Sequence, residues 1–360
     1  MKDRTNLEHA LSKLVAGFES LRADGSFHEP NLDGSPGDYV SFDGWEWPQG
    51  VGLYGMAQLW LARGCDAPTG QMLRDWYARA MARGLPAMNV NTTAPMLALS
   101  ILWRETRDPA HGDLLADWAG RVMRDAPRTP FGGIQHDVSD RLNRGELWDD
   151  TLFMVALFLA SYGQGAGRPD LVDEALRQFL VHAQFLADPE TGLWFHGWTF
   201  EGRHNFARAR WARGNAWVTA CLLDVFDLAE VPDTVAPFLR DLLRDQVAAL
   251  IPLQRPDGAW TTLLDDPESY PETSATAGFA YGLMKGARLG LLGPDAAQAG
   301  ARALDYVLGQ IGPDGVVAGV SYGTRMGHDL QFYRDIPIQP TGYGQSLAIL
   351  ALVEALKGGA

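Results

Sequence analysis

Two adjacent carboxylates stand where charge is costly, directly in front of an apolar segment. Asp149 and Asp150 precede a run of apolar residues from Leu152 to Ala160. The pair could cap a helix, because an N-terminal Asp accepts hydrogen bonds from free backbone N–H groups. A second carboxylate in a poorly hydrated place has its pKa raised by burial and by like charge. A carboxylic acid prepared in this way can act as a general acid near neutral pH.

A cationic stretch, RARWARGNAW, interrupts an acidic chain with Arg208, Arg210 and Arg213. Arg213 lies between Trp211 and Trp217 at the start of an apolar segment, where a guanidinium should be paired. Its partner is either an anionic ligand or a carboxylate of the protein itself.

A histidine stands close to a glycine turn in the segment GLWFHGW. His196 follows Phe195 and comes two residues before Trp198. A lone histidine is more often a structural group than a catalytic one, so the residues alone leave its role open.

Glycine turns that recur along the chain define the elements that must position these residues. Turn signatures at Gly133, Gly192, Gly258 and Gly315 recur about every 60 residues, and Gly25 and Gly84 extend the series towards the N-terminus. Six units of about 60 residues fill the chain. A Gly that follows Asp, Pro or Gly supports a tight β-hairpin turn.

Two kinds of helical pattern alternate between these turns. Segments such as 168–187 and 233–251 are amphipathic, which predicts helices with one wet face. The others are apolar on nearly every side, which predicts buried helices: 50–62, 93–103, 148–162, 212–229, 273–290 and 341–356. Six buried helices alternating with six half-exposed ones predict an all-α (α/α)6 barrel, formed as a single domain over residues 1–360.

In such a barrel, the segments that precede the inner helices meet at one mouth. They are residues 44–50, 89–95, 144–151, 204–215, 265–274 and 334–344. Around this mouth we expect seven aromatic residues: Trp45, Trp47, Trp148, Trp211, Trp217, Tyr270 and Tyr343. Aromatic faces stack on the apolar C–H surfaces of sugar rings, so the pattern favours a carbohydrate site, although each ring taken singly could belong to the core.

Composition excludes several other classes of function. The chain has 44 acidic and 30 basic residues, and its formal charge of -14 opposes binding to nucleic acid or an anionic membrane. Cys65 and Cys221 lack metal-ligand spacing, so we expect no metal or other cofactor. The N-terminal residues lack a continuous apolar region of a secretory signal, which predicts a cytoplasmic protein, either monomer or homodimer.

Five motifs resemble a known family, the unsaturated rhamnogalacturonyl hydrolases of glycoside hydrolase family 105, which is related to the unsaturated glucuronyl hydrolases of family 88. The motifs are WPQGVGLYGM (47–56), ELWDDTLFM (146–154), GLWFHGW (192–198), WARGNAW (211–217) and PETSATAGFAYGLMKG (271–286). The resemblance extends over almost the whole chain in order, and it implies an (α/α)6 barrel.

The resemblance also implies an unusual glycosidase reaction on a small oligosaccharide. Its substrate carries a C4=C5 double bond in a terminal uronic acid, most simply an unsaturated galacturonyl group on rhamnose. Asp150 is implied to protonate C4 and then, as a carboxylate, to help water attack C5. The two-carboxylate geometry of ordinary glycosidases would then not apply.

Further roles are carried over by resemblance onto single positions. His196 is implied to lie near the reacting ring, and Trp211, Arg213 and Trp217 are implied to stack on and hydrogen-bond the uronate. Trp47, Trp148 and Asp149 are assigned to the walls of the binding site. A second family Asp is expected before the second inner helix, but Asn91 stands near that place, so a hydrogen bond would replace a carboxylate there. The segment 321–333 is expected to close over the mouth.

Three alternatives remain open from the sequence. One is an unsaturated glucuronyl hydrolase acting on ulvan-type or glycosaminoglycan-type oligosaccharides. Another is a different (α/α)6 carbohydrate enzyme, such as a conventional glycosidase or a sugar epimerase, which would need a second carboxylate or a histidine pair opposite Asp150. The third is a saccharide-binding protein without catalysis.

Overall fold

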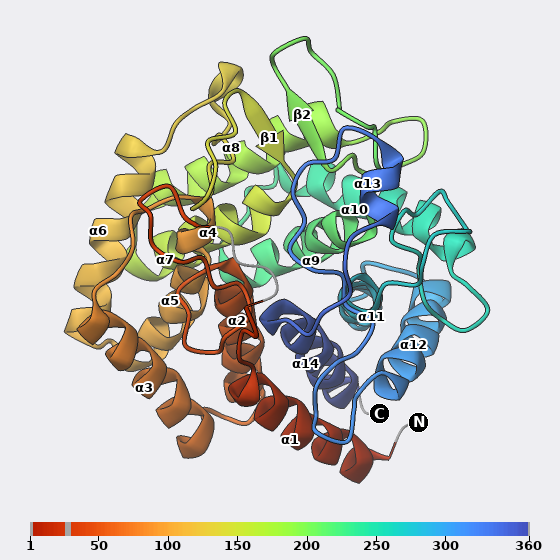
Figure 1. Ribbon diagram of the computed structural model, residues 1–360, viewed down its shortest axis with the longest axis horizontal. Coiled ribbons are helices and arrows are strands. Elements are labelled where there is room, and N and C mark those ends of the chain that lie inside the picture. The colour runs from red at the N-terminus through yellow and green to blue at the C-terminus, as the bar shows by residue number, and fades with distance from the viewer. Residues whose placement is uncertain (1–2, 26–29, 359–360) are drawn as a thin grey trace.

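Twelve long helices form two concentric rings in the computed structural model, which describes residues 3–25 and 30–358 (Figure 1). The inner ring contains α2 (Trp47–Ala62), α5 (Pro95–Thr106), α7 (Leu157–Ala166), α9 (Ala212–Leu228), α11 (Thr273–Arg288) and α14 (Gly342–Lys357). The outer ring contains α1 (Arg4–Ser20), α3 (Ala67–Arg83), α6 (Pro109–Asp125), α8 (Pro169–Leu186), α10 (Ala236–Leu250) and α12 (Pro294–Gly309). The predicted (α/α)6 barrel is confirmed.

The last inner helix closes the ring, since α14 packs against both α2 and α1. Burial follows the two sequence patterns. Almost every residue of α9 and α14 is buried, whereas α8 and α12 bury one face and expose the other. No helix within the described residues is long and apolar enough to cross a membrane.

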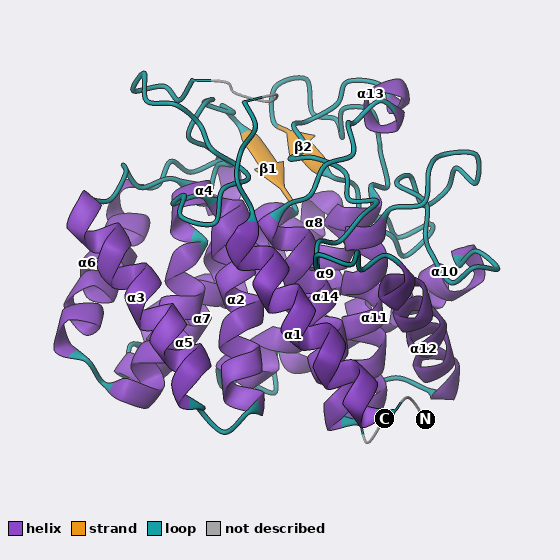
Figure 2. Ribbon diagram, turned by 60° about the horizontal axis from the view of Figure 1, so that its bottom comes forward, coloured by secondary structure: helices purple, strands orange, loops and turns teal. Residues whose placement is uncertain are grey.

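The two ends of the barrel differ. Figure 2 shows long loops, the strands β1 (Glu146–Trp148) and β2 (Gly197–Thr199), and the short helices α4 (Val90–Thr93) and α13 (Leu330–Arg334) above one end. The other end carries short connections, and α1 begins and α14 ends there. The segments before the inner helices therefore share one mouth, as predicted.

Backbone bridges flank three of the predicted glycine turns: Arg128↔Ile134, Ala187↔Trp194 and Ile311↔Val317. The predicted β-hairpin turns between repeats are thus present. At Gly192 the backbone φ is +82°, and an added Cβ would lie 2.6 Å from the carbonyl oxygen of Asp245. A side chain at this turn would meet both backbone strain and a clash.

The third inner helix begins later than the predicted segment 148–162. Residues 146–148 form β1 instead, because they pair antiparallel with β2, with Trp148 opposite Gly197. A π-helical turn, η2 (Leu152–Ala156), then leads into α7. Such π-turns inside helices are often found at functional sites. This arrangement ties the Asp149–Asp150 segment to the segment that carries His196.

Candidate active site

A cavity of about 560 Å³ opens at the loop end of the barrel. Its wall combines aromatic, polar and charged side chains from four segments of the mouth: Tyr39, Trp47, Asn91, His136, Asp140, Arg141, Trp148, Asp150, Tyr322, Arg325 and Phe332. Four of the predicted site residues are among them, namely Trp47, Asn91, Trp148 and Asp150. The segment 321–333 supplies Tyr322, Arg325 and Phe332, so it lies over the mouth as expected.

Asp150 faces the cavity and is backed by His196. The Asp150 side chain is 11% exposed, and its Oδ2 lies 3.5 Å from Nε2 of the buried His196. The pairing of β1 with β2 creates this contact, and the Asp149 N–H donates to the His196 carbonyl oxygen at 3.1 Å. Asp150 is therefore the carboxyl group placed to meet a ligand.

A tyrosine on α13 orients the histidine. The Tyr333 hydroxyl lies 2.8 Å from Nδ1 of His196 and accepts a hydrogen bond from the Gly327 N–H at 3.2 Å. The hydroxyl has two acceptors within reach, Nδ1 at 2.8 Å and the weaker acceptor Met326 Sδ at 3.7 Å. We assign its hydrogen to Nδ1, the closer and stronger acceptor, which places the imidazole proton on Nε2, facing Asp150. Burial lowers the pKa of His196, so the ring is neutral at neutral pH.

The two adjacent carboxyl groups have opposite pKa shifts. Burial, together with the charge of Asp150, raises the pKa of Asp149 well above its ordinary value. Burial also acts to raise the pKa of Asp150, but the contacts with His196 outweigh it and hold that pKa below the ordinary value. The expectation that burial prepares Asp150 itself is therefore corrected, because Asp150 has an imidazole N–H partner and Asp149 does not.

Two tryptophans form aromatic walls of the cavity. Trp47 stacks on Tyr343 with ring centroids 4.5 Å apart, and Trp148 stacks on His136 at 4.3 Å. The indole N–H of Trp148 donates to the Glu146 carboxylate at 2.8 Å. These contacts fix both rings, as a sugar-stacking platform requires.

Asn91 lies on the cavity wall at the place where the resemblance expects a second Asp. Its amide lies near the Tyr39 hydroxyl and the Glu46 carboxyl group, and it partly offsets the rise in pKa that burial causes at each of them. Burial raises the pKa of Glu46 to about 7, and the Ser139 hydroxyl donates to it. An amide with an adjacent buried acid therefore occupies this side of the cavity.

Trp211, Arg213 and Trp217 do not reach the cavity wall. They are buried, with exposed fractions of 0–1%, and Trp217 packs against Trp47 and Tyr343 with ring centroids 6.4 Å from each. The Trp211 ring lies 4.4 Å from the His196 ring and 4.4 Å from the Arg213 guanidinium. Their direct contact with a substrate stays a prediction. The described geometry shows Trp211 packing against His196, and Arg213 packing against Trp211.

The Arg213 guanidinium forms hydrogen bonds with other groups of the protein. It donates to the carbonyl oxygens of Ser321 and Tyr322 at 2.8 and 3.0 Å, and to the Thr324 hydroxyl at 2.7 Å. The Glu272 carboxylate lies 3.7 Å away. Of the two partners that the sequence left open for Arg213, the structure shows the carboxylate of the protein itself.

Asp149 is fully buried and does not line the cavity, unlike the wall position assigned to it. Oxygen and nitrogen atoms of Asp149, Asp150 and His196 all lie within 4.8 Å of one another, which is close enough to surround a cation. Metal ligands must be deprotonated, so a cation bound here would have to displace the proton that burial favours on Asp149. The expectation of no metal or cofactor stays a prediction.

Two candidate functional residues, His136 and Tyr333, were not predicted from the sequence. His136 lies four residues after Gly132, just as His196 lies four residues after Gly192, so comparing equivalent repeat positions would have found it. Its Nδ1 lies 2.8 Å from the Thr151 hydroxyl, and burial lowers its pKa to about 3. Tyr333 carries no comparable signal, because its partner is 137 residues away.

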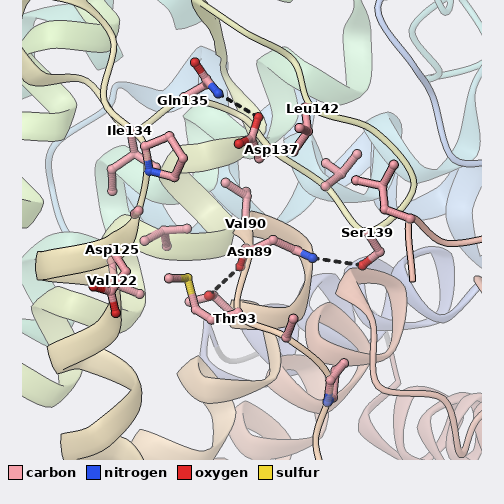
Figure 3. A pocket seen from close by; sticks show the side chains of 18 of the residues that line it. Asn89, Val90, Thr93, Val122, Asp125, Ile134, Gln135, Asp137, Ser139 and Leu142 are labelled. Carbon is pink, nitrogen blue, oxygen red and sulfur yellow. Dashed lines mark hydrogen bonds between the residues drawn. The ribbon is translucent and has the colours of Figure 1, made fainter. Parts of the chain in front are cut away.

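A second cavity, of about 360 Å³, lies behind the segment 137–142 (Figure 3). Its lining is mainly apolar, and Val138 borders both cavities. Figure 3 shows the hydrogen bonds that engage its polar groups, from Gln135 to Asp137 at 2.8 Å and from Asn89 to Ser139 at 3.1 Å. None of the predicted site residues lines this second cavity.

A six-hairpin barrel with an oriented acid and stacked tryptophans at one mouth defines a glycosidase-type carbohydrate enzyme. The chain belongs to Glycosyl Hydrolase Family 88, whose sequence pattern matches residues 21–358. The predicted family resemblance and enzyme class are confirmed.

Several proteins of known sequence or structure are similar to this one over most of the chain. The unsaturated rhamnogalacturonyl hydrolase YesR of Bacillus subtilis is 33% identical over 316 residues, which cover 87% of this chain and 90% of that protein. A structure from Salmonella enterica, described as a possible member of the GH105 family, is 43% identical with a TM-score of 0.97 and covers 100% of this chain and 96% of its own. The unsaturated glucuronyl hydrolase of Bacillus sp. GL1 shares the fold, with a TM-score of 0.73 at 18% identity, and the match covers 99% of this chain and 97% of that one.

Proposed function

We propose that this enzyme removes a Δ4,5-unsaturated uronic acid from the non-reducing end of an oligosaccharide by hydrating its C4=C5 double bond. The observation that carries the proposal is the position of Asp150. Its carboxyl group lines the cavity and lies 3.5 Å from the His196 imidazole. The similarity to YesR over most of both chains supports the same substrate class.

The reaction adds one molecule of water. The π electrons of the double bond take a proton from Asp150 to form the C4–H bond, and positive charge develops at C5 and the ring oxygen. The Asp150 carboxylate then accepts a proton from water as the water oxygen bonds to C5. The hemiketal opens and releases the leaving sugar, and Asp150 is protonated again. His196 orients Asp150 throughout, and Trp47 and Trp148 flank the sugar ring.

The preferred substrate is an unsaturated galacturonyl group linked to rhamnose, as the name of YesR indicates for that relative. The test follows loss of the double-bond absorbance on lyase products of rhamnogalacturonan, and it measures release of the leaving sugar from both these products and the saturated disaccharide as control. Turnover of the unsaturated substrate alone supports the proposal. Cleavage of the saturated control at a comparable rate would instead indicate a conventional glycosidase.

A second candidate is an unsaturated uronyl group linked to a more anionic sugar. Arg141 and Arg325 both line the cavity, and Arg141 makes no ion pair with any residue in the described ranges. Arg325 pairs with Asp140 of the same wall, so Arg141 is the cation that a sulfated or carboxylated leaving sugar would meet. Lyase products of ulvan and glycosaminoglycans in the same assay decide between the two, because the better substrate has the higher kcat/KM.

We also propose that one barrel formed by the whole chain acts on small oligosaccharides in the cytoplasm, as a monomer or homodimer. Fractionation of cells and light scattering of the purified protein test the location and the oligomeric state.

A further inference from the structure

Asp149 is a buried carboxyl group without a hydrogen-bond donor. Its side chain is 0% exposed, and neither carboxyl oxygen receives a hydrogen bond from the described residues. Burying an ionised carboxylate in this state is strongly unfavourable, whereas a neutral carboxylic acid is tolerated. The neighbouring Asp150 differs, because its Oδ2 faces Nε2 of His196 at 3.5 Å, a long contact with an N–H donor.

The position of Asp149 is built into the fold. Its backbone N–H donates to the His196 carbonyl oxygen at 3.1 Å, and its carbonyl oxygen accepts from the Leu152 N–H at 3.2 Å. On α9, Gly214 leaves room for the carboxyl group, since an added Cβ would lie 2.2 Å from Oδ2 of Asp149. The carboxyl group therefore fills a space that only glycine leaves open.

The charged and titratable groups around Asp149 do not neutralise it as a carboxylate. Arg213 of α9 is engaged with Ser321, Tyr322 and Thr324, and no ion pair joins it to Asp149 among the described residues. The other groups that act on Asp149 or are affected by its charge are Asp150, His196, Cys221 and Tyr333. Of these, only Asp150 is a carboxylate that can accept a proton from Asp149.

We propose that Asp149 and Asp150 share a single proton, which Asp149 stores in the resting enzyme and passes to Asp150 for delivery to the substrate. This inference rests on the proposed function. The O–H bond of Asp149 breaks as an O–H bond forms on Asp150, and the latter breaks as the substrate C4–H bond forms. The attacking water returns a proton to Asp150, and from there to Asp149, so no other co-reactant is needed. Asp149 does not touch the substrate and is a positioning residue.

The kinetic test compares wild type with Asp149→Asn, which keeps the shape of the side chain but cannot store the proton. In the variant, Asp150 keeps its contact with His196 and is rarely protonated at neutral pH. We expect kcat near pH 7 to fall about tenfold or more. The alkaline limb of the kcat profile should move down by about one pH unit or more. KM should change by less than about twofold. A profile identical to wild type, or one reduced equally at every pH, overturns the proposal.

A second measurement does not depend on the substrate or on folding of the variant. Carbon-13 NMR of protein labelled at the Asp side-chain carboxyl groups reports their protonation in the resting enzyme. We expect a protonated Asp signal near pH 7 in wild type and in Asp150→Asn, and its loss in Asp149→Asn. Absence of this signal from wild type overturns the proposal. If wild type shows the signal but turns over no unsaturated substrate, the proposed function fails while the shared proton stands.

Discussion

The Tyr333 hydroxyl lies 2.8 Å from Nδ1 of His196, and this contact joins helix α13, above the mouth of the barrel, to the histidine behind Asp150. The hydroxyl also accepts from the N–H of Gly327, and of its two acceptors, Nδ1 is closer and stronger than the Met326 sulfur at 3.7 Å, so its hydrogen is assigned to Nδ1. The imidazole then presents an N–H to Asp150 from its other side, 3.5 Å away. The orientation of the acid thus depends on a residue outside the helical rings.

Replacing Tyr333 with Phe should slow the reaction without blocking binding. The variant leaves Nδ1 of the buried His196 without its partner, so the Nε2–H tautomer is no longer fixed. We expect kcat to fall about tenfold, equivalent to about 1.4 kcal/mol in activation free energy. Steady-state kinetics on the unsaturated disaccharide measure this, and KM should stay within about twofold.

Tyr77→Phe is the matched control for that variant. Tyr77 is also fully buried and donates a hydrogen bond, to the Pro95 carbonyl oxygen at 2.6 Å, but it lies outside the catalytic cavity. Both variants should lose about 1–2 kcal/mol of unfolding free energy. If both also reduce kcat equally, Tyr333 has no specific role in orienting His196.

Gly214→Ala should disturb the two carboxyl groups directly. The new methyl group would lie 2.2 Å from Oδ2 of Asp149, so the carboxyl group or α9 must move. We expect about 1–3 kcal/mol of destabilisation, together with a lower kcat. Gly309 in α12 has no heavy atom near an added Cβ, so Gly309→Ala should leave both kcat and stability nearly unchanged or improve stability slightly. Equal behaviour of the two variants would show that the space beside Asp149 is not needed.

Stability should fall when the pH drops below about 6.5, because buried histidines resist protonation. Burial lowers the pKa of His136 to about 3, so the unfolded chain binds a proton there before the native protein does. The stabilisation is complete above the unfolded pKa of about 6.5 and is lost as the pH falls towards the folded value. At pH 5 the loss from His136 should be about 2 kcal/mol.

Urea unfolding at pH 7 and pH 5 tests this contribution. His136→Gln removes the titrating group while keeping a polar side chain of similar reach, so its stability should depend less on pH over this range. An unchanged difference between the two pH values in the variant would mean that His136 does not titrate as its burial requires.

Arg213→Lys should destabilise residues 321–324, part of which lines the cavity. The guanidinium binds Ser321, Tyr322 and Thr324 together, and a single ammonium group cannot reproduce that fork. We expect a loss of about 2 kcal/mol or more in unfolding free energy and a lower kcat/KM, because Tyr322 and Thr324 line the cavity. Unchanged stability with a raised KM would instead favour the predicted direct contact with the uronate.

The barrel could be read from the sequence because each repeat carries a glycine turn and two distinguishable helical patterns. The Asp149–Asp150 pair also stood out, since carboxylates before the apolar segment 152–160 are costly unless they have a role, but the choice of Asp150 as the acid came from the family resemblance. The repeat spacing and the helical patterns are local properties of the chain, and the ring geometry then brings the mouth together.

Other parts of the site depend on contacts between distant loops. Asp149 has a raised pKa and Asp150 a lowered one because His196 faces Asp150. The sequence shows only two adjacent aspartates and does not reveal which of them the histidine contacts. Arg213 sits in a cationic motif, yet its partners come from residues 321–324, whose path the helical patterns do not specify.

The central claim is that Asp150 protonates the unsaturated sugar, and Asp150→Asn tests it most directly. The variant preserves the size of the side chain but removes the transferable proton. The rate of loss of double-bond absorbance on a lyase-generated disaccharide should fall at least about 100-fold, with circular dichroism showing an intact fold. Retention of a rate near that of wild type would contradict the account.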